Sequence, residues 1–412
     1  MRVLMFGWEF PPFQAGGLAT ATLGLVKGLL HRGIEVTLVV PFAAVGTPVP
    51  NLRIISAADE RPGLRSIRVD SPLMPYVRAE EYLALSGGVR AGAGEAVYGA
   101  SLFDEVERYA DIAELIAREE PHDLIDTHDW LTFEAGRRAR AISGKPLVAH
   151  IHATEYDRCG GPGNPEIHRR EGQGMSAADR VISNSHALKR QVVGRYGIPS
   201  QKIDVVHFGI DIPSDDEELE DLPVVRDRPT VLFLGRVTRQ KGPEYFVELA
   251  ARVSDQVPEA HFILAGTGDL LPAVIERTVE LGLTGKVHFA GAVKGAEVDR
   301  LYRAADVCVM PSVSEPLGLV ALESLRNGTP CVIPQESGVA EVLRHALRVD
   351  FWDVEEMANK VASLLRYPVL WEELSEAGYR EVTSRRLGLD NAARRTADCY
   401  AMVTSNRLAV AT

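Results

Sequence analysis

Short apolar runs alternate with longer amphipathic stretches along almost the whole chain. Strands that are apolar on both sides are typical of parallel sheets covered by helices on both faces. Strands that alternate with helices predict an α/β fold built from doubly wound parallel sheets. The predicted helices include residues 18–31, 244–257 and 353–365. The predicted strands are residues 3–6, 36–40, 124–126, 147–151, 181–183, 203–206, 231–234, 262–265, 287–289, 307–310 and 331–333.

The pattern divides the chain into two halves. Residues 212–222, IPSDDEELEDL, combine a proline with a run of acids and are interpreted as a solvated linker. We therefore expect one Rossmann-like domain over residues 1–212 and a second over 222–390. A new helical pattern follows Gly388-Leu389-Asp390, and we expect the C-terminal helix within 391–412 to pack back on the first domain. Residues 41–100 are rich in Pro and Gly and show weak periodicity, so no element is assigned there.

Composition narrows the class of protein. A chain of 412 residues is too long for one ordinary domain, and a net charge of -12 argues against a broad nucleic-acid surface. No segment approaches the roughly 18 apolar residues that span a bilayer. The N-terminal MRVLMFG leads directly into a strand rather than a signal peptide. The four cysteines lack metal-ligand spacing, and Cys308 and Cys331 lie in apolar runs that are typical of core thiols. Free core thiols favour a reducing compartment, so we expect a cytoplasmic protein. Its oligomeric state cannot be predicted from the sequence.

The segment SEPLGLVALESLRNG at residues 314–328 carries the strongest chemical signal. Glu315 precedes a predicted helix and Glu323 lies within it, with Gly318 at the expected N-terminus. Backbone N–H groups at a helix N-terminus bind phosphate, and carboxylates accept hydrogen bonds from sugar hydroxyls. The segment therefore indicates a nucleotide-sugar site.

A second candidate phosphate site is the glycine pair Gly16-Gly17, which stands between a predicted strand and the helix at residues 18–31. Glycine lets backbone N–H groups approach a ligand closely, and the helix dipole favours a diphosphate there. The surrounding residues match neither a Walker loop nor a dinucleotide fingerprint. An ordinary strand-to-helix turn remains the alternative.

Two further loops follow predicted strands of the second half. Arg236 and Lys241 leave the carboxyl end of one strand, where open α/β sheets bind ligands. Two cations there can bind a diphosphate and neutralise a leaving nucleotide, although a solvated basic loop is the alternative. Gly266, in Gly-Thr-Gly after the next strand, either lies under the nucleotide or serves only as a turn.

In the first half, polar residues gather where two predicted strands end. His128 and Asp129 follow one strand, and His152 follows the next. The adjoining Glu155, Asp157 and Arg158 make this segment more polar than a strand exit requires, so we expect it to line a cleft. Hydrogen-bonded structural histidines are the alternative. No H-x-x-x-H spacing appears, so no metal is expected.

Taken together, these motifs resemble the retaining glycosyltransferases of family 4, and the resemblance covers nearly the whole chain. Within that family the chain looks like the branch that includes bacterial glycogen and starch synthases. The resemblance implies the GT-B fold, in which two Rossmann-like domains face a central cleft. The motifs are Gly16-Gly17, HDWLT (128–132), HIHATE (150–155), ADRVISNS (178–185), VVHFGID (205–211), FLGRVTRQKG (233–242) and EPLGLVALE (315–323).

The resemblance also implies roles for residues that match the motifs. Gly17, Arg236 and Lys241 would contact the donor diphosphate, and the Gly318-Leu319 N–H groups would hold its distal phosphate. Family members generally need neither metal nor other cofactor. The remaining implied contacts are sugar hydroxyls for Glu315, ribose hydroxyls for Glu323 and the neighbourhood of the anomeric carbon for His152.

The implied reaction is transfer of a hexose, most simply glucose, from a UDP- or ADP-linked donor to a hydroxyl of a carbohydrate or polyol, with a glucan as one candidate. No nucleophile stands out, so we expect front-side displacement with retention. Glycogen synthases usually carry Lys-x-Gly-Gly near the N-terminus, whereas this chain has no lysine in residues 13–17. A GT-B sugar phosphorylase, a nucleotide-sugar epimerase and a non-catalytic carbohydrate-binding protein remain alternatives.

Overall fold

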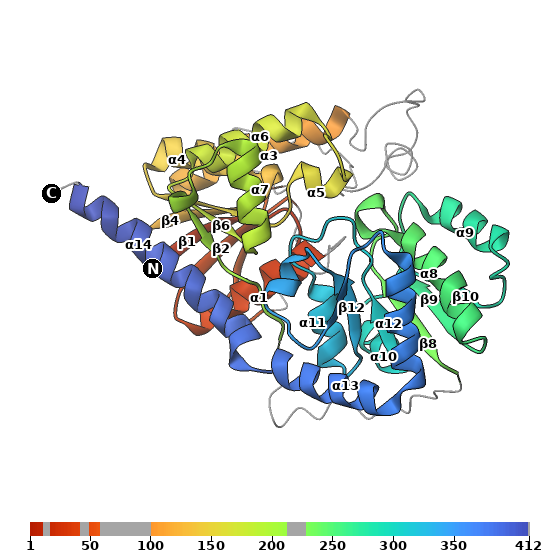
Figure 1. Ribbon diagram of the computed structural model, residues 1–412. Coiled ribbons are helices and arrows are strands. Elements are labelled where there is room, and N and C mark those ends of the chain that lie inside the picture. Colours follow the sequence, from red (N-terminus) through yellow and green to blue (C-terminus); the bar gives the residue numbers. More distant parts are fainter. Residues whose placement is uncertain (11–16, 42–48, 58–99, 212–227, 411–412) are drawn as a thin grey trace.

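A computed structural model describes residues 1–10, 17–41, 49–57, 100–211 and 228–410. These residues form two lobes, each built on a parallel sheet with helices on both faces (Figure 1). The prediction of two doubly wound parallel-sheet domains is therefore confirmed. The acidic run at 212–222, interpreted above as a linker, and Gly16 both lie outside the described residues.

The first sheet has seven strands in the order β3-β2-β1-β4-β5-β6-β7. The strand order reverses between β1 and β4, and such a switch point places a crevice at the carboxyl ends of the strands. The strands are β1 (Arg2–Phe6), β2 (Glu35–Val40), β3 (Arg53–Ser56), β4 (Leu124–His128), β5 (Leu147–Ile151), β6 (Arg180–Ser183) and β7 (Ile203–Val205).

The second sheet has six strands in the order β10-β9-β8-β11-β12-β13, and its order reverses between β8 and β11. Its strands are β8 (Thr230–Leu234), β9 (His261–Ala265), β10 (Val287–Gly291), β11 (Val307–Val309), β12 (Cys331–Pro334) and β13 (Leu347–Val349). The sequence pattern missed β3 and β13. Both are short edge strands, and β13 contains an exposed Arg348 at its centre. Neither therefore gives a continuous apolar run.

Helices cover both faces of each sheet (Figure 1). Those of the first lobe are α1 (Gly17–His31), α3 (Ala100–Glu119), α4 (Trp130–Ser143), α5 (Glu155–Cys159), α6 (Pro165–Ala177) and α7 (His186–Tyr196). Those that follow are α8 (Pro243–Gln256), α9 (Leu271–Glu280), α10 (Ala296–Ala304), α11 (Leu319–Arg326), α12 (Val354–Arg366), α13 (Pro368–Val382) and α14 (Leu389–Val410). Short 3₁₀ turns cover Ser200–Lys202, Arg239–Lys241, Gly338–Glu341 and Arg385–Leu387.

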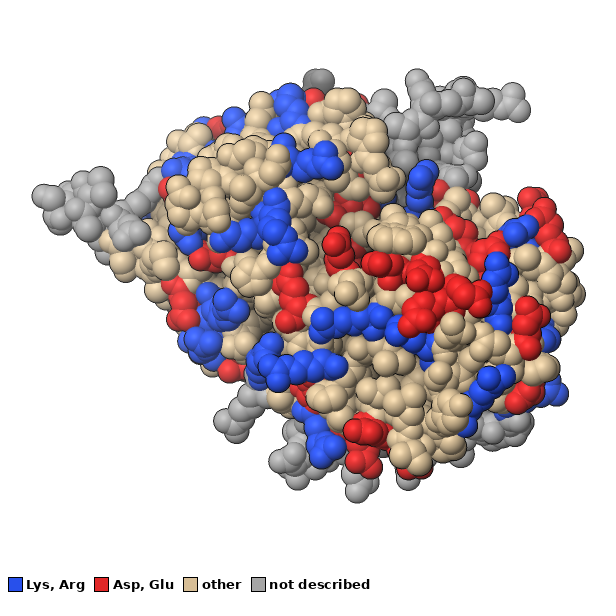
Figure 2. All heavy atoms as spheres, viewed as in Figure 1, with Lys and Arg blue, Asp and Glu red and all other residues tan. Residues whose placement is uncertain are grey.

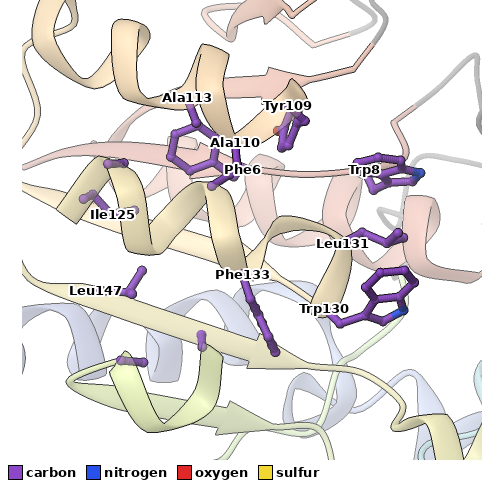
Figure 3. Close-up of a cluster of buried hydrophobic side chains, with 14 of the residues drawn as sticks. Phe6, Trp8, Tyr109, Ala110, Ala113, Ile125, Trp130, Leu131, Phe133 and Leu147 are labelled. Atoms are coloured by element: carbon purple, nitrogen blue, oxygen red, sulfur yellow. The ribbon is translucent and has the colours of Figure 1, made fainter. Parts of the chain in front are cut away.

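Aromatic side chains fill the core between the first sheet and helices α3 and α4. Phe6 and Trp8 from the β1 segment meet Tyr109 of α3, while Trp130 and Phe133 come from α4 (Figure 3). The Tyr109 hydroxyl donates to the Gly7 and Val39 carbonyls at 3.1 and 2.8 Å, so its polar end is satisfied inside the core. This packing fixes the β1 and β4 ends, where the crevice begins.

Helix α14 packs against α1 on the opposite face of the first sheet (Figure 1). Close approach depends on two glycines of α1. A Cβ at Gly24 would lie 2.5 Å from a Leu389 methyl, and one at Gly28 would lie 2.5 Å from the Ala393 Cβ. The last helix of the chain therefore becomes part of the first domain's core.

The surface and the helices agree with the composition. On the face drawn in Figure 2, Lys and Arg side chains are interspersed with Asp and Glu. Among the helices of the described ranges, none is long and apolar enough to cross a membrane.

Candidate active site

The first-lobe side of the site is built where β4 and β5 end. His128 pairs with His150 in register across these strands, and His152 follows β5 by one residue. His128 Nδ1 and His152 Nε2 share a hydrogen bond at 2.9 Å. His152 is half-buried, whereas His128 is fully buried. The structure thus brings together the histidines of two separate sequence motifs.

Asp129 combines backbone strain with a buried carboxyl. Its φ of 61° and ψ of 172° fall in a region that is populated almost only by glycine. Its side chain accepts the His152 backbone N–H at 2.7 Å. Burial raises the pKa of Asp129 to about 6, although Arg158, 4.0 Å away, opposes this shift. Strain and a perturbed carboxyl at one strand end are typical of a functional site.

The segment after His152 divides into a buried part and a part at the domain boundary. Arg158, with only 5% of its side chain exposed, binds the carboxylates of Glu171 and Glu155. Glu155 also accepts the Asn164 backbone N–H at 3.0 Å. Glu155 and Arg158 were expected to line the cleft on the acceptor side. The structure places them within the domain, where they support the segment that carries Asp157.

Asp157 lies at the boundary between the two lobes. Its Oδ2 accepts the backbone N–H and the hydroxyl of Thr154, both at 2.7 Å, and its Oδ1 accepts the Ser314 hydroxyl at 2.6 Å. Burial raises the pKa of this carboxyl above its ordinary value. Since Ser314 immediately precedes Glu315, this bond connects the predicted acceptor side to the predicted donor side.

On the donor side, Lys241 and Glu315 form an ion pair. Lys241 Nζ donates to Glu315 Oε2 at 2.5 Å, and the Ser312 hydroxyl donates to the same oxygen at 3.0 Å. Arg236 is half-buried, and its Nη2 donates to Gln240 Oε1 at 3.0 Å. A lysine from the β8 loop therefore pairs with a carboxylate from the β11 loop, at the switch point of the second sheet.

Glycines allow these loops to pack backbone to backbone. A Cβ at Gly266 would lie 1.8 Å from the Gly235 carbonyl oxygen, and one at Gly338 would lie 1.9 Å from the Pro316 carbonyl oxygen. Gly266 is therefore required by contact with the Arg236 loop, whether or not a nucleotide lies over it.

Helix α11 begins as the sequence predicted. Gly318 is its N-cap, with a φ of 105°, and Leu319 is its first residue. The first N–H groups of a helix lack intrahelical acceptors, so they are available to an anion. Further along α11, Glu323 Oε2 accepts the Tyr302 hydroxyl at 3.0 Å, and burial raises the pKa of Glu323. In the other lobe, Gly17 is the first residue of α1.

Three ring nitrogens of His128, His150 and His152 lie within 4.8 Å of one another, close enough to be metal ligands. Their rings, however, are stacked. The His128 centroid lies 4.5 Å from that of His150 and 5.1 Å from that of His152, with interplanar angles of 13° and 17°. His128 Nδ1 and His152 Nε2 are already joined to each other by a hydrogen bond at 2.9 Å. The geometry fits a hydrogen-bonded cluster better than a metal centre.

Sequence reasoning missed Ser312, Ser314, Tyr302, Asp126 and Tyr400, all of which contact the residues above or their neighbours. A signal existed for Asp126. It occupies the same strand face as His128, two residues away, and directly follows the apolar Leu124 and Ile125. Tyr400 carried no such signal, because its partner lies on a distant strand.

Fold and loop chemistry together define a two-domain glycosyltransferase of GT-B architecture. The family described as "Glycosyl transferase 4-like domain" matches residues 16–209, and that described as "Glycosyl transferases group 1" matches 214–381. The chain belongs to the family 4 glycosyltransferases. It is 30% identical to an uncharacterised glycosyltransferase of Methanocaldococcus jannaschii, over 97% of this chain and 98% of that protein.

Three further proteins are similar to this chain, and the two solved structures among them bear on the fold alone. The chain is 30% identical to D-inositol 3-phosphate glycosyltransferase 2 of Catenulispora acidiphila, over 94% of this chain and 90% of the relative. Among solved structures, sucrose-phosphate synthase of Thermosynechococcus elongatus superposes with a TM-score of 0.74 at 21% identity, covering 98% and 99% of the two chains. Anabaena HepE in complex with UDP and glucose gives a TM-score of 0.70 at 17% identity, covering 98% and 100%.

Proposed function

We propose that this enzyme transfers a hexose, with retention, from a nucleoside diphosphate sugar to a hydroxyl of a carbohydrate or polyol. The observation that carries the proposal is the Lys241–Glu315 pair, with Arg236 on the same loop as Lys241. Lys241 and Arg236 would bind the donor diphosphate and stabilise the departing nucleoside diphosphate.

Glu315 is suited to hold the sugar. Lys241 and Ser312 both donate to Oε2, and no bond to Oε1 is made by the residues that the structure describes. That oxygen can accept a sugar hydroxyl without loss of the ion pair. A carboxylate neutralised by a lysine at 2.5 Å is a poor nucleophile, which favours front-side displacement over a covalent intermediate.

The other donor groups have matching chemistry. The N-terminus of α11 at Gly318-Leu319 would receive the distal phosphate, and Glu323, oriented by Tyr302, would accept the ribose hydroxyls. Gly17 at the start of α1 would face the diphosphate from the other lobe. No step in this scheme uses a metal or a cofactor.

Across the boundary, His152, Asp129 and Asp157 would form the acceptor side. The Ser314–Asp157 bond would hold the two sides together while the sugar is transferred. UDP-glucose is the first donor to test, because HepE was determined with UDP and glucose. Polyol phosphates are acceptors to include, because relatives are named D-inositol 3-phosphate glycosyltransferases.

The test measures nucleoside diphosphate release from UDP-, ADP- and GDP-hexoses, with and without short glucans, polyols and D-inositol 3-phosphate. We expect one donor to release its nucleotide, faster with one acceptor, and the product to keep the donor's anomeric configuration by NMR. The variant Arg236→Ala should lose activity. Its matched control is Arg252→Ala, which removes a surface ion pair between Arg252 of α8 and Glu355 of α12. Sugar phosphate formation from inorganic phosphate, or donor isomerisation without nucleotide release, would replace this proposal with a phosphorylase or an epimerase.

A further inference from the structure

A row of polar side chains interrupts the apolar face of the first sheet that packs against α1 and α14. Leu124 of β4 and Val148 of β5 belong to that hydrophobic core, yet Asp126, His128 and His150 on the same face are at most 1% exposed. Burying such groups is unfavourable unless they satisfy one another. An apolar residue at each position would continue the core, so these groups have a purpose beyond packing.

Asp126 is at the centre of this row. Its Oδ2 accepts the Tyr400 hydroxyl of α14 at 2.5 Å and lies 3.4 Å from His128 Nε2, while Oδ1 lies 3.3 Å from His150 Nε2. Burial alone would raise the pKa of Asp126, but the imidazoles of His150 and His128 lower it below the ordinary value. The carboxylate is therefore ionised and faces two ring nitrogens.

A lone pair facing a carboxylate is repelled, so His128 Nε2 must carry a proton. The 3.4 Å between Asp126 and His128 Nε2 is long for a hydrogen bond. No other group in the described part of the chain is bonded to this nitrogen, so the carboxylate is the group that it faces. In the tautomer with its proton on Nε2, His128 presents a lone pair at Nδ1. His152 Nε2, 2.9 Å away, must then be the donor of the bond that joins the two rings.

We propose that Tyr400, Asp126 and His128 form a polar chain that holds His152 as a neutral imidazole with its proton on Nε2. The Nδ1 atom of His152 is then an acceptor, and no side chain of the described residues occupies it. On the proposed function, it accepts a hydrogen bond from a hydroxyl of the donor sugar or the acceptor. Tyr400, Asp126 and His128 are positioning residues that act through His152.

The environment of His152 keeps its ring neutral. Burial and the neighbouring His128 and His150 lower the pKa of His152, opposed only by Asp126. Asp129 contacts its backbone N–H, and Phe208 stacks on the ring at 5.1 Å. A neutral ring with a fixed tautomer differs from a general acid, because it presents a lone pair where an imidazolium would present a proton.

The test reads the tautomer directly in the free enzyme. Nitrogen-15 NMR of the histidine rings, with the His152 signals assigned by their loss in His152→Gln, should show a protonated Nε2 and an unprotonated Nδ1 near neutral pH. Asp126→Leu should convert this to a mixture of tautomers. Thr396→Val is the matched control, because Thr396 is buried one turn away on α14 and its hydroxyl has no bonding partner in the described ranges.

Kinetics provide a second readout. Asp126→Leu should lower kcat about 10- to 100-fold, because the His152 ring would no longer be held in one tautomer during the reaction. The donor KM should change little. Tyr400→Phe removes one hydrogen bond to the carboxylate and should lower kcat by about 3- to 10-fold. Thr396→Val should leave both constants unchanged.

Two outcomes would overturn the chain: a wild-type His152 protonated on Nδ1, or a tautomer that is unchanged in folded Asp126→Leu. If that variant does not fold, the wild-type spectrum and the kinetics of Tyr400→Phe still decide. Because the NMR experiment needs neither donor nor acceptor, the chain can hold even if no glycosyl transfer is found, and it can fail even if transfer is found.

Discussion

Asp129→Asn should make the protein more stable and less active. The backbone at Asp129 has a positive φ, and asparagine tolerates positive φ about as well as aspartate does. The new side chain can still accept the His152 backbone N–H through its oxygen. The substitution therefore removes one buried charge and leaves the shape and the principal hydrogen bond in place.

The magnitude follows from the pKa of this carboxyl, which is about 6 in the folded protein against 3.8 for an unperturbed aspartate. A raised carboxyl pKa means that the folded state binds more protons than the unfolded state between about pH 4 and pH 6. Stability of the wild type is therefore lost as the pH rises through this window. At about 1.4 kcal/mol per unit, the loss above pH 6 amounts to about 3 kcal/mol, which Asp129→Asn should recover.

The assay is urea unfolding of wild type and variant at pH 4 and pH 7.5. The variant should be more stable by about 3 kcal/mol at pH 7.5 and nearly equal to the wild type at pH 4. A variant that is less stable at pH 7.5 would refute the reasoning, because it would show that Arg158 stabilises the charge by more than burial destabilises it. Activity should fall at pH 7.5, where the wild-type carboxyl is ionised, and should change less at pH 4, where it is protonated.

Three further predictions concern the donor side. Arg236→Ala should lower kcat/KM about 10- to 100-fold, since a charge-assisted hydrogen bond contributes about 1.5–3 kcal/mol, and unchanged kinetics would remove Arg236 from the site. Glu323→Ala should raise the donor KM more than it lowers kcat, with Tyr302→Phe giving a smaller change in the same direction; a defect confined to kcat would place Glu323 in the chemistry. Gly338→Ala should lower the melting temperature measured by calorimetry, because its Cβ would lie 1.9 Å from the Pro316 carbonyl oxygen; an unchanged melting temperature would show that the two loops can separate freely.

The long elements could be predicted from sequence because their buried residues form a continuous hydrophobic pattern. Residues 147–151 were predicted as a strand with the observed bounds, and the helix predicted at 18–31 begins one residue earlier, at Gly17. Edge strands such as β3 are only partly buried, so their hydrophobic pattern is weak. Local pattern therefore reports burial, and it fails where burial is incomplete.

The site could be predicted only as far as its chemistry is local in sequence. Glu315 and Gly318 are close neighbours on one motif, and the structure keeps them at the start of α11. The His128–His152 bond and the Tyr400–Asp126 bond depend on strand register and on the packing of α14, which no local pattern contains. The burial of Glu155 was missed although its partners Arg158 and Asn164 lie close in sequence, because polar residues alone do not show that they satisfy one another inside the domain.

The chain passes twice between the lobes, and the two passages lie side by side. Ile210 forms a parallel bridge with Gly388, and a Cβ at Gly209 would lie 2.2 Å from the Leu387 carbonyl oxygen. Two chain segments joined side by side resist twisting more than a single segment does, but they bend readily about the line that joins them. We therefore expect the lobes to open and close by a hinge rotation about one axis. Each closure would return Ser314 to the same place opposite Asp157.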